Sequence, residues 1–155
     1  MIIGTGFGAG FWPWGPGTAG AVLATAIWFV LQGLLTTAAL QLTILALILL
    51  FSALGTWATQ RLMPFWGDDP SRVVVDEMVG AWLALLPVAL WPSAGASAWW
   101  PPLAALLLFR FFDIAKPLGI RALDLRRGAF WVMADDLLAG IYAAIVLAIL
   151  LICIS

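Results

Sequence analysis

The stretch AFWVMADDLLAGIYAAIVLAILLI at residues 129–152 combines a long apolar run with a pair of adjacent aspartates. A helix needs about 20 predominantly apolar residues to cross a bilayer, and this stretch reaches that length with Asp135 and Asp136 as its charges. Charged side chains are costly inside a membrane and usually mark functional sites there. The stretch therefore predicts a membrane helix that carries chemistry near one end.

The composition of the whole chain agrees with a membrane location. The 155 residues are 65% hydrophobic and 10% charged, with a mean hydropathy of +1.10, whereas about 25% of the residues of an average soluble domain are charged. The net charge is −1, and because no basic stripe is present to meet a phosphate backbone, we expect no nucleic-acid partner. We therefore expect one membrane-embedded domain over residues 1–155, surrounded by the lipid bilayer, in an oligomeric state that the sequence leaves open.

The apolar segments predict how the chain crosses the bilayer. We expect spans at about residues 18–34, 38–59, 73–91, 99–115 and 129–152. The first is short, so a tilted or re-entrant element is an alternative there. A Gly- and Pro-rich stretch, GFGAGFWPWGPGTAG at residues 6–20, precedes it. The predicted fold class is all-α: a polytopic membrane helical bundle of about five membrane segments with a Gly/Pro-rich N-terminal loop.

The basic residues predict the orientation of this bundle. With the N-terminus in the cytoplasm, the segments 61–72 and 116–127 both face the cytoplasm, and all seven Lys and Arg residues fall on that side. The opposite side receives the short turn at residues 36–37 and the loop at 92–98, which contain no Lys or Arg. Because cytoplasmic loops are enriched in Lys and Arg, we expect the charged end of the bundle to face the cytoplasm.

Five carboxylates gather at one depth of this arrangement. Asp76 and Glu77 begin the third span, Asp113 ends the fourth, and Asp135 and Asp136 lie in the fifth. Antiparallel neighbours would bring them to one membrane level, where they repel one another unless a cation neutralises them. A site made only of carboxylate oxygens prefers a hard ion, so we expect Mg²⁺, with Mn²⁺ or Ca²⁺ as alternatives.

The residue types limit the chemistry of such a site. The chain has no histidine, and its one cysteine lies in the terminal apolar run, which excludes His- or Cys-dependent phosphatases and Ser-His-Asp hydrolases. Adjacent helical residues point about 100° apart, so we expect one acid of each adjacent pair to bind the ion and the other to orient it or hold a second ion. The alternative is that these acids are solvated or paired with Arg and Lys at the interface.

Basic side chains lie beside the acids. Arg110, Asp113 and Lys116 recur at helical spacing and share one face. Arg110 and Lys116 are suited to phosphate oxygens, and anchoring to lipid headgroups is the alternative. We favour anchoring for the paired arginines that end the segment GIRALDLRR at residues 119–127, which we expect to form a helix lying on the membrane.

The Gly/Pro-rich stretch leads into the first span. Thr18 follows Pro16 and Gly17 directly, and we expect it to cap the helix and leave backbone N–H groups facing the cytoplasm. Such a loop suits close approach to an anion. Tight packing of small residues against another helix is the alternative, and we favour it.

Four ordered blocks resemble a known family. FRFFDIAKPLGIRALD at residues 109–124, preceded by VDEMVG at 75–80 and followed by MADDLLAG at 133–140, is similar to bacterial phosphatidylglycerophosphatase A. The stretch at residues 6–20 is similar to the N-terminal block of the same family. The sequence departs from the family pattern at residues 126–131, where RRGAFW stands in place of a Gly-Gly-rich stretch.

The resemblance implies a Mg²⁺-dependent lipid phosphatase of phospholipid biosynthesis, in the bacterial inner (cytoplasmic) membrane. It implies removal of the terminal phosphate of phosphatidylglycerophosphate, which yields phosphatidylglycerol and inorganic phosphate, at a site facing the cytoplasm. The residues at matching motif positions are Thr18, Asp76, Glu77, Arg110, Asp113, Lys116, Arg121, Asp124, Asp135 and Asp136.

We assign roles from the residues and the resemblance together. The expected metal ligands are Asp76, Glu77, Asp113, Asp135 and Asp136. The expected catalytic residues are Asp76, Asp113 and Asp135, and the expected substrate-binding residues are Thr18, Arg110, Lys116 and Arg121. Direct attack by water and an aspartyl-phosphate route are both compatible with this set. The competing class is a small transporter or channel with an acidic ion site, which the uncharged outer half of every span disfavours.

Overall fold

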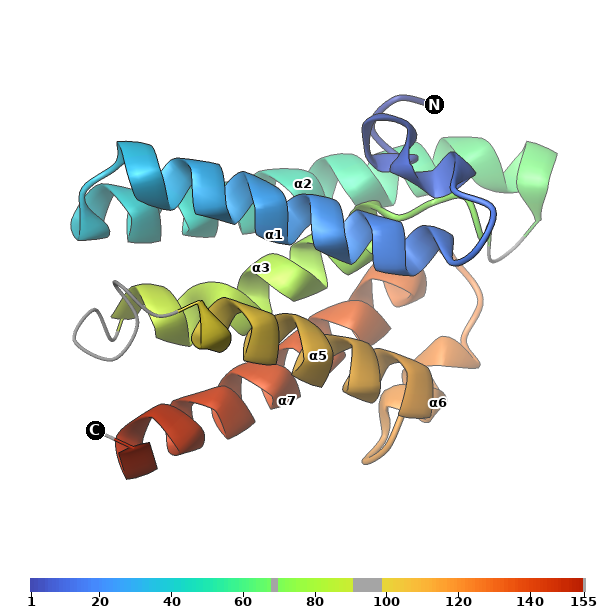
Figure 1. Cartoon of the computed structure of the whole chain (residues 1–155). Helices are drawn as coiled ribbons and strands as arrows, with labels where there is room; N and C mark the ends of the chain where they lie inside the picture. Colours follow the sequence, from blue (N-terminus) through green and yellow to red (C-terminus); the bar gives the residue numbers. More distant parts are fainter. Residues whose placement is uncertain (68–69, 91–98, 155) are drawn as a thin grey trace.

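The computed structural model of the chain describes residues 1–67, 70–90 and 99–154, and it is helical with no strand in those ranges (Figure 1). The elements are η1 (Gly6–Phe11), α1 (Pro16–Leu34), α2 (Thr37–Trp66), α3 (Val75–Leu90), α5 (Trp100–Ala115), α6 (Ile120–Asp124) and α7 (Ala129–Ile154). The prediction of an all-α bundle is confirmed.

Helix α3 lies at the centre of the bundle, where it packs against α1, α2, α5 and α7 (Figure 1). Its side chains are buried on nearly every side, Trp82 and Leu85 among them, as expected of a helix that is apolar all round. Gly80 and Gly140 bring α3 and α7 together, because a Cβ on Gly140 would lie 2.6 Å from the carbonyl oxygen of Gly80. Small residues allow such close approach between membrane helices.

Within the described residues, three helices are long and apolar enough to cross a membrane: α1, α2 and α7. Helices α3 and α5 have 16 residues each, fewer than the roughly 20 residues that a perpendicular span requires. The count of about five membrane segments therefore stays a prediction. The end of the third predicted span at residue 91 and the predicted outer loop at 92–98 lie outside the described residues.

The first two helices run antiparallel, joined by a short turn (Figure 1). Helix α1 is one continuous helix of 19 residues, which favours a span over the re-entrant alternative. Helix α2 continues well beyond the predicted end of its span at residue 59, because a charge ends an apolar run but does not end a helix. Arg61 stays helical with its guanidinium 5.8 Å from the ring centroid of Trp57, and Gly67, with a φ of 95°, ends the helix.

Candidate active site

A cavity of about 340 Å³ opens at one end of the bundle, where α3, α5 and α7 approach the start of α1. Its lining includes the carboxylates Asp76, Glu77, Asp113, Asp135 and Asp136. Three helices thus bring the five predicted acids to one place, as the antiparallel arrangement of their segments predicts. The chemical roles assigned to the individual residues stay predictions.

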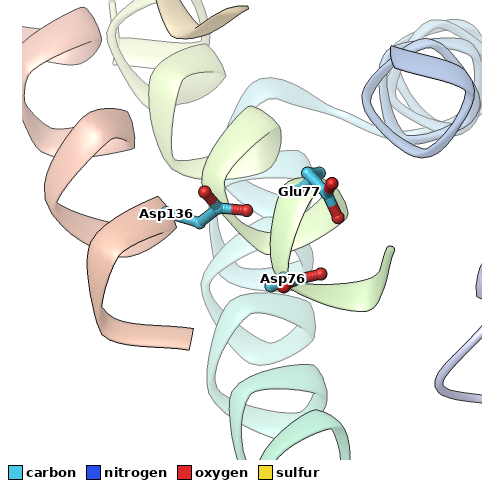
Figure 2. A group of neighbouring side chains, drawn as sticks. All are labelled: Asp76, Glu77 and Asp136. Atoms are coloured by element: carbon cyan, nitrogen blue, oxygen red, sulfur yellow. The ribbon is translucent and has the colours of Figure 1, made fainter. Parts of the chain in front are cut away.

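Asp76, Glu77 and Asp136 form the most compact part of this lining, and we call them the carboxylate trio (Figure 2). One oxygen from each lies within 4.8 Å of the others. Among the described residues, no hydrogen-bond partner reaches the buried Oδ1 of Asp76 or the buried Oε2 of Glu77. Buried oxygens without partners are costly, and a hard cation is a suitable partner for them. The trio therefore has the ligand chemistry of a hard-cation site, and its occupation by Mg²⁺ stays a prediction.

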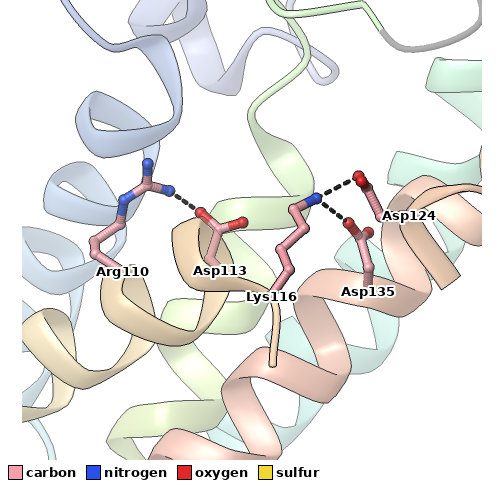
Figure 3. Close-up of polar contacts among 5 residues, drawn as sticks. All are labelled: Arg110, Asp113, Lys116, Asp124 and Asp135. Carbon is pink, nitrogen blue, oxygen red and sulfur yellow. Dashed lines mark hydrogen bonds and ion pairs between the residues drawn. The ribbon is translucent and has the colours of Figure 1, made fainter. Parts of the chain in front are cut away.

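The two adjacent acid pairs behave differently. On α7, Asp136 joins the trio, while Asp135 accepts a hydrogen bond of 2.7 Å from Nζ of Lys116 (Figure 3). On α3, both Asp76 and Glu77 bring an oxygen to the trio (Figure 2). The convergence thus involves one acid of the α7 pair and both acids of the α3 pair, and which of them bind an ion stays a prediction. The longer side chain of Glu77 compensates for the different direction of its Cα–Cβ bond.

Ion pairs hold the rest of the polar network together (Figure 3). Arg110 donates to Asp113 one turn further along α5. Lys116 donates to both Asp124 of α6 and Asp135 of α7. Lys116 ends α5 in the left-handed backbone conformation, with a φ of 46°, which is uncommon for a non-glycine residue. The lysine therefore links three helices at the edge of the cavity.

The environment of Lys116 keeps its amine charged. Partial burial by itself would lower the pKa of the ammonium group, but the hydrogen bonds to Asp124 and Asp135 outweigh it. The net result is a pKa raised above the ordinary lysine value. Lys116 is consequently a permanent positive charge at neutral pH.

Two of the predicted substrate-binding residues are not part of the cavity lining. Thr18 is exposed in the first turn of α1, and Arg121 is exposed on α6; neither lines the cavity. The predicted capping role of Thr18 is wrong. Pro16 already occupies the first helical position, so the cap is Gly15, with a φ of 126° and no side-chain capping hydrogen bond.

The glycine before Thr18 contacts the site instead. Gly17 lines the cavity, and a Cβ at this position would collide with the carboxylate of Glu77 and crowd the guanidinium of Arg110. Ala19 donates the first hydrogen bond of α1, to the carbonyl of Gly15 over 3.0 Å. The amides of Gly17 and Thr18 precede that bond at the positive end of the helix dipole. Tight packing and approach to the site thus coincide in this loop.

Sequence reasoning missed Arg126 and Arg127 as parts of the site. Both line the cavity, whereas membrane anchoring was favoured for them, and nothing in the structure tests anchoring. The guanidinium of Arg126 lies 4.2 Å from the ring centroid of Trp131. Gly128, with a φ of 119°, lets the chain turn back into α7 directly after the arginines. A glycine predicts the turn but not the direction of the arginine side chains, so the sequence carried no signal for their place in the lining.

Comparison with known protein families matches residues 2–151 to phosphatidylglycerophosphatase A. The chain belongs to the phosphatidylglycerophosphatase A family. The resemblance seen in the sequence motifs is therefore confirmed, and with it the expectation of an enzyme of the phosphatidylglycerophosphatase class. Together with its three long apolar helices, membership of this family makes the chain a membrane protein.

Curated relatives extend along nearly the whole chain. The phosphatidylglycerophosphatase A of Haemophilus influenzae is 36% identical over 94% of this chain and 84% of its own length. The Escherichia coli K12 enzyme of that name is 30% identical over 92% of this chain and 78% of its own length. A Bacteroides thetaiotaomicron protein named "Putative phosphatidylinositol-3-phosphatase" is 51% identical over 96% of this chain and 91% of its own length. No solved structure matches the chain.

Proposed function

We propose that this protein hydrolyses the terminal phosphate monoester of phosphatidylglycerophosphate to phosphatidylglycerol and inorganic phosphate. The reaction would use Mg²⁺ held by carboxylates, at the cytoplasmic face of the bacterial inner membrane. The observation that carries the proposal is the convergence of Asp76, Glu77 and Asp136 on one point of a cavity, in a chain that belongs to the family named for this reaction.

Asp76, Glu77 and Asp136 would hold the ion, because their oxygens already converge and two of them have no hydrogen-bond partner among the described residues. When bound, Mg²⁺ supplies Lewis-acid polarisation of the phosphate and neutralises charge that develops on its oxygens. The protein contributes the fixed position of these acids on two packed helices, α3 and α7.

The remaining residues of the cavity act on the phosphate and the water. Arg110 and Lys116 present positive charge to the phosphate oxygens that face away from the trio. Asp113 or Asp135 accepts a proton from the attacking water as its oxygen bonds to phosphorus in line with the departing ester oxygen. That ester oxygen leaves with the bonding electrons and takes up a proton to become a hydroxyl group.

The direct route competes with a covalent one. A carboxylate of the cavity attacking phosphorus would give an aspartyl-phosphate, which water then hydrolyses. Rapid quenching with lipid labelled in its terminal phosphate separates the two routes. Label found only in free phosphate and unreacted lipid supports direct attack by water, and acid-stable label retained on the protein supports the covalent route.

A second headgroup has its own support. The Bacteroides relative, at 51% identity, carries the name of a phosphatidylinositol-3-phosphatase. Phosphatidylinositol 3-phosphate also presents a phosphate monoester on a polyol that a phosphodiester joins to diacylglycerol. The same trio and the same basic residues would therefore serve it, and only the contacts with the polyol would differ.

Phosphate release from both lipids tests the proposal. The purified protein in detergent receives phosphatidylglycerophosphate or phosphatidylinositol 3-phosphate at equal mole fraction, with Mg²⁺ or with EDTA, and Asp136→Asn serves as the inactive control. We expect release from phosphatidylglycerophosphate that EDTA and the substitution both abolish. Release from the inositol lipid alone would move the assignment to the second headgroup. No release from either lipid by folded protein would contradict the phosphatase and favour the transporter alternative.

A further inference from the structure

Arg126 stacks on an aromatic ring at the rim of the cavity. It is exposed in the connection between α6 and α7, lines the cavity, and places its guanidinium carbon 4.2 Å from the ring centroid of Trp131. A guanidinium held by its face against a ring keeps its N–H donors at the edge, where they suit the paired oxygens of a phosphate. Arg126, which lines the cavity, is therefore a preformed hydrogen-bond donor for an anion, supported by a ring that is not itself part of the lining.

Among the described residues, no carboxylate pairs with Arg126, in contrast to two other basic groups of the cavity. Arg110 pairs with Asp113, and Lys116 pairs with Asp124 and Asp135. In the part of the chain that the structure describes, Arg126 forms no ion pair, and its contact is the ring of Trp131. An anionic group arriving from outside would complete its electrostatic environment.

The stack lies at a defined distance from the acids. Trp131 and Asp135 are four residues apart on α7, so they share a helical face, separated by roughly 6 Å along the axis. The cavity thus contains two places for a phosphate. One is at the carboxylate trio, and the other is at Arg126 beside Trp131, which precedes Asp136 of the trio by five residues, or roughly 7.5 Å along the axis of α7.

Both candidate substrates carry two phosphates, a terminal monoester and a phosphodiester that joins the polyol to diacylglycerol. On the basis of the proposed function, we infer that the Arg126–Trp131 stack binds the phosphodiester while the monoester lies at the trio. The stack would then select lipids in which a polyol separates the two groups. Phosphatidic acid has only the monoester, and phosphatidylglycerol has only the diester, so each of these lipids probes one of the two places.

Inhibition by these two lipids tests the inference. Phosphate release from phosphatidylglycerophosphate, or from the inositol lipid if the enzyme prefers it, is measured with each lipid as competitor, for the native protein and for Arg126→Ala. We expect the substitution to raise KM and the inhibition constant of phosphatidylglycerol by roughly tenfold or more, with kcat and the inhibition constant of phosphatidic acid within about twofold. The inference would be overturned if Arg126→Ala raised the inhibition constants of both lipids equally or raised neither.

Matched variants separate a lost phosphate contact from a general loss of charge. Arg61→Ala removes an arginine that also lies over a tryptophan, Trp57 at 5.8 Å, but outside the cavity; it should change neither inhibition constant. Trp131→Ala should raise the inhibition constant of phosphatidylglycerol as Arg126→Ala does. Trp131→Phe, which keeps an aromatic face, should retain most of the affinity for phosphatidylglycerol. If the native protein releases no phosphate, the proposed function fails. If the native protein releases phosphate, and phosphatidylglycerol inhibits Arg126→Ala as strongly as it inhibits the native protein, only this inference fails.

Discussion

Helices α2 and α3 are both strongly apolar, but they occupy opposite positions in the molecule. Leu49 on α2 is 73% exposed, whereas Leu85 on α3 is 0% exposed. Helix α2, with 30 residues, turns much of its surface outward, and α3, with 16 residues, is enclosed by four other helices. The shorter helix nevertheless supplies two of the three acids of the trio.

The comparison shows why the site lies where it does. An acid on the outward face of α2 near an end of the helix would meet water or lipid headgroups and needs no protein partner. An acid on α3 is surrounded by protein, where an unpaired charge is costly, so Asp76 and Glu77 require a cation or hydrogen bonds. Enclosure by protein, rather than hydropathy, therefore marks the helix that carries the chemistry.

The largest expected effect comes from removing one charge of the trio. Asp76→Asn and Asp136→Asn keep the shape of the side chain, so we expect turnover of the lipid to fall at least about 100-fold with unchanged helical content. Phosphate release per mole of folded protein measures it. The control is Cys153→Ser, exposed near the end of α7, which should retain full turnover. More than a tenth of native turnover in both aspartate variants would contradict the site.

Truncating the core of α3 should cost stability. Leu85→Ala removes a fully buried side chain and leaves a space that its neighbours fill only in part, so we expect a loss of about 2–5 kcal/mol in the free energy of unfolding. Reversible unfolding in mixed detergent, followed by circular dichroism, gives the value. A loss below about 0.5 kcal/mol would mean that α3 is not the packed centre of the bundle.

Separating α3 from α7 should have an intermediate effect. Gly140→Ala places a Cβ 2.6 Å from the carbonyl oxygen of Gly80, so the helices must move apart, at a cost of about 1–3 kcal/mol. Turnover should fall as well, because Asp136 lies one turn away on the same helix. Gly33→Ala on α1 meets no atom within 4 Å and is the matched control. Equal stability of the two variants would argue against close packing here.

The smallest effect is expected on the outer face of α2. Leu49→Ala shortens a side chain with few protein contacts, so the free energy of unfolding should change by no more than about 0.5 kcal/mol. The same unfolding assay as for Leu85→Ala makes the two values comparable. A destabilisation as large as that of Leu85→Ala would place α2 inside an interface and remove the contrast with α3.

Much of the fold follows from the order of residues along the chain. Apolar runs separated by Gly, Pro and charged residues predict the start and end of α5 and the start of α7 to within a residue. The five acids can also be identified from the sequence, because carboxylates are rare within apolar segments. The central position of α3 cannot be predicted in this way, because hydropathy does not distinguish a helix surrounded by lipid from one surrounded by protein.

The pairing of the polar residues depends on tertiary contacts. Lys116 donates a hydrogen bond to Asp135, 19 positions away in the sequence. Asp135 therefore pairs with the lysine, whereas its neighbour Asp136 belongs to the trio. A local pattern contains no such information. The capping role predicted for Thr18 is wrong for a local reason: Pro16 sets the first helical position, so the cap is Gly15.

Binding of Mn²⁺ to the purified protein tests the carboxylate trio most directly. Carboxylate sites that accept Mg²⁺ also accept Mn²⁺, and electron paramagnetic resonance counts the free ion during a titration. We predict that the native protein binds Mn²⁺, that excess Mg²⁺ displaces it, and that Asp136→Asn weakens the binding at least about tenfold. Equal affinity in the native and Asp136→Asn proteins, or no binding by folded native protein, would contradict the assignment of Asp76, Glu77 and Asp136 as a metal site.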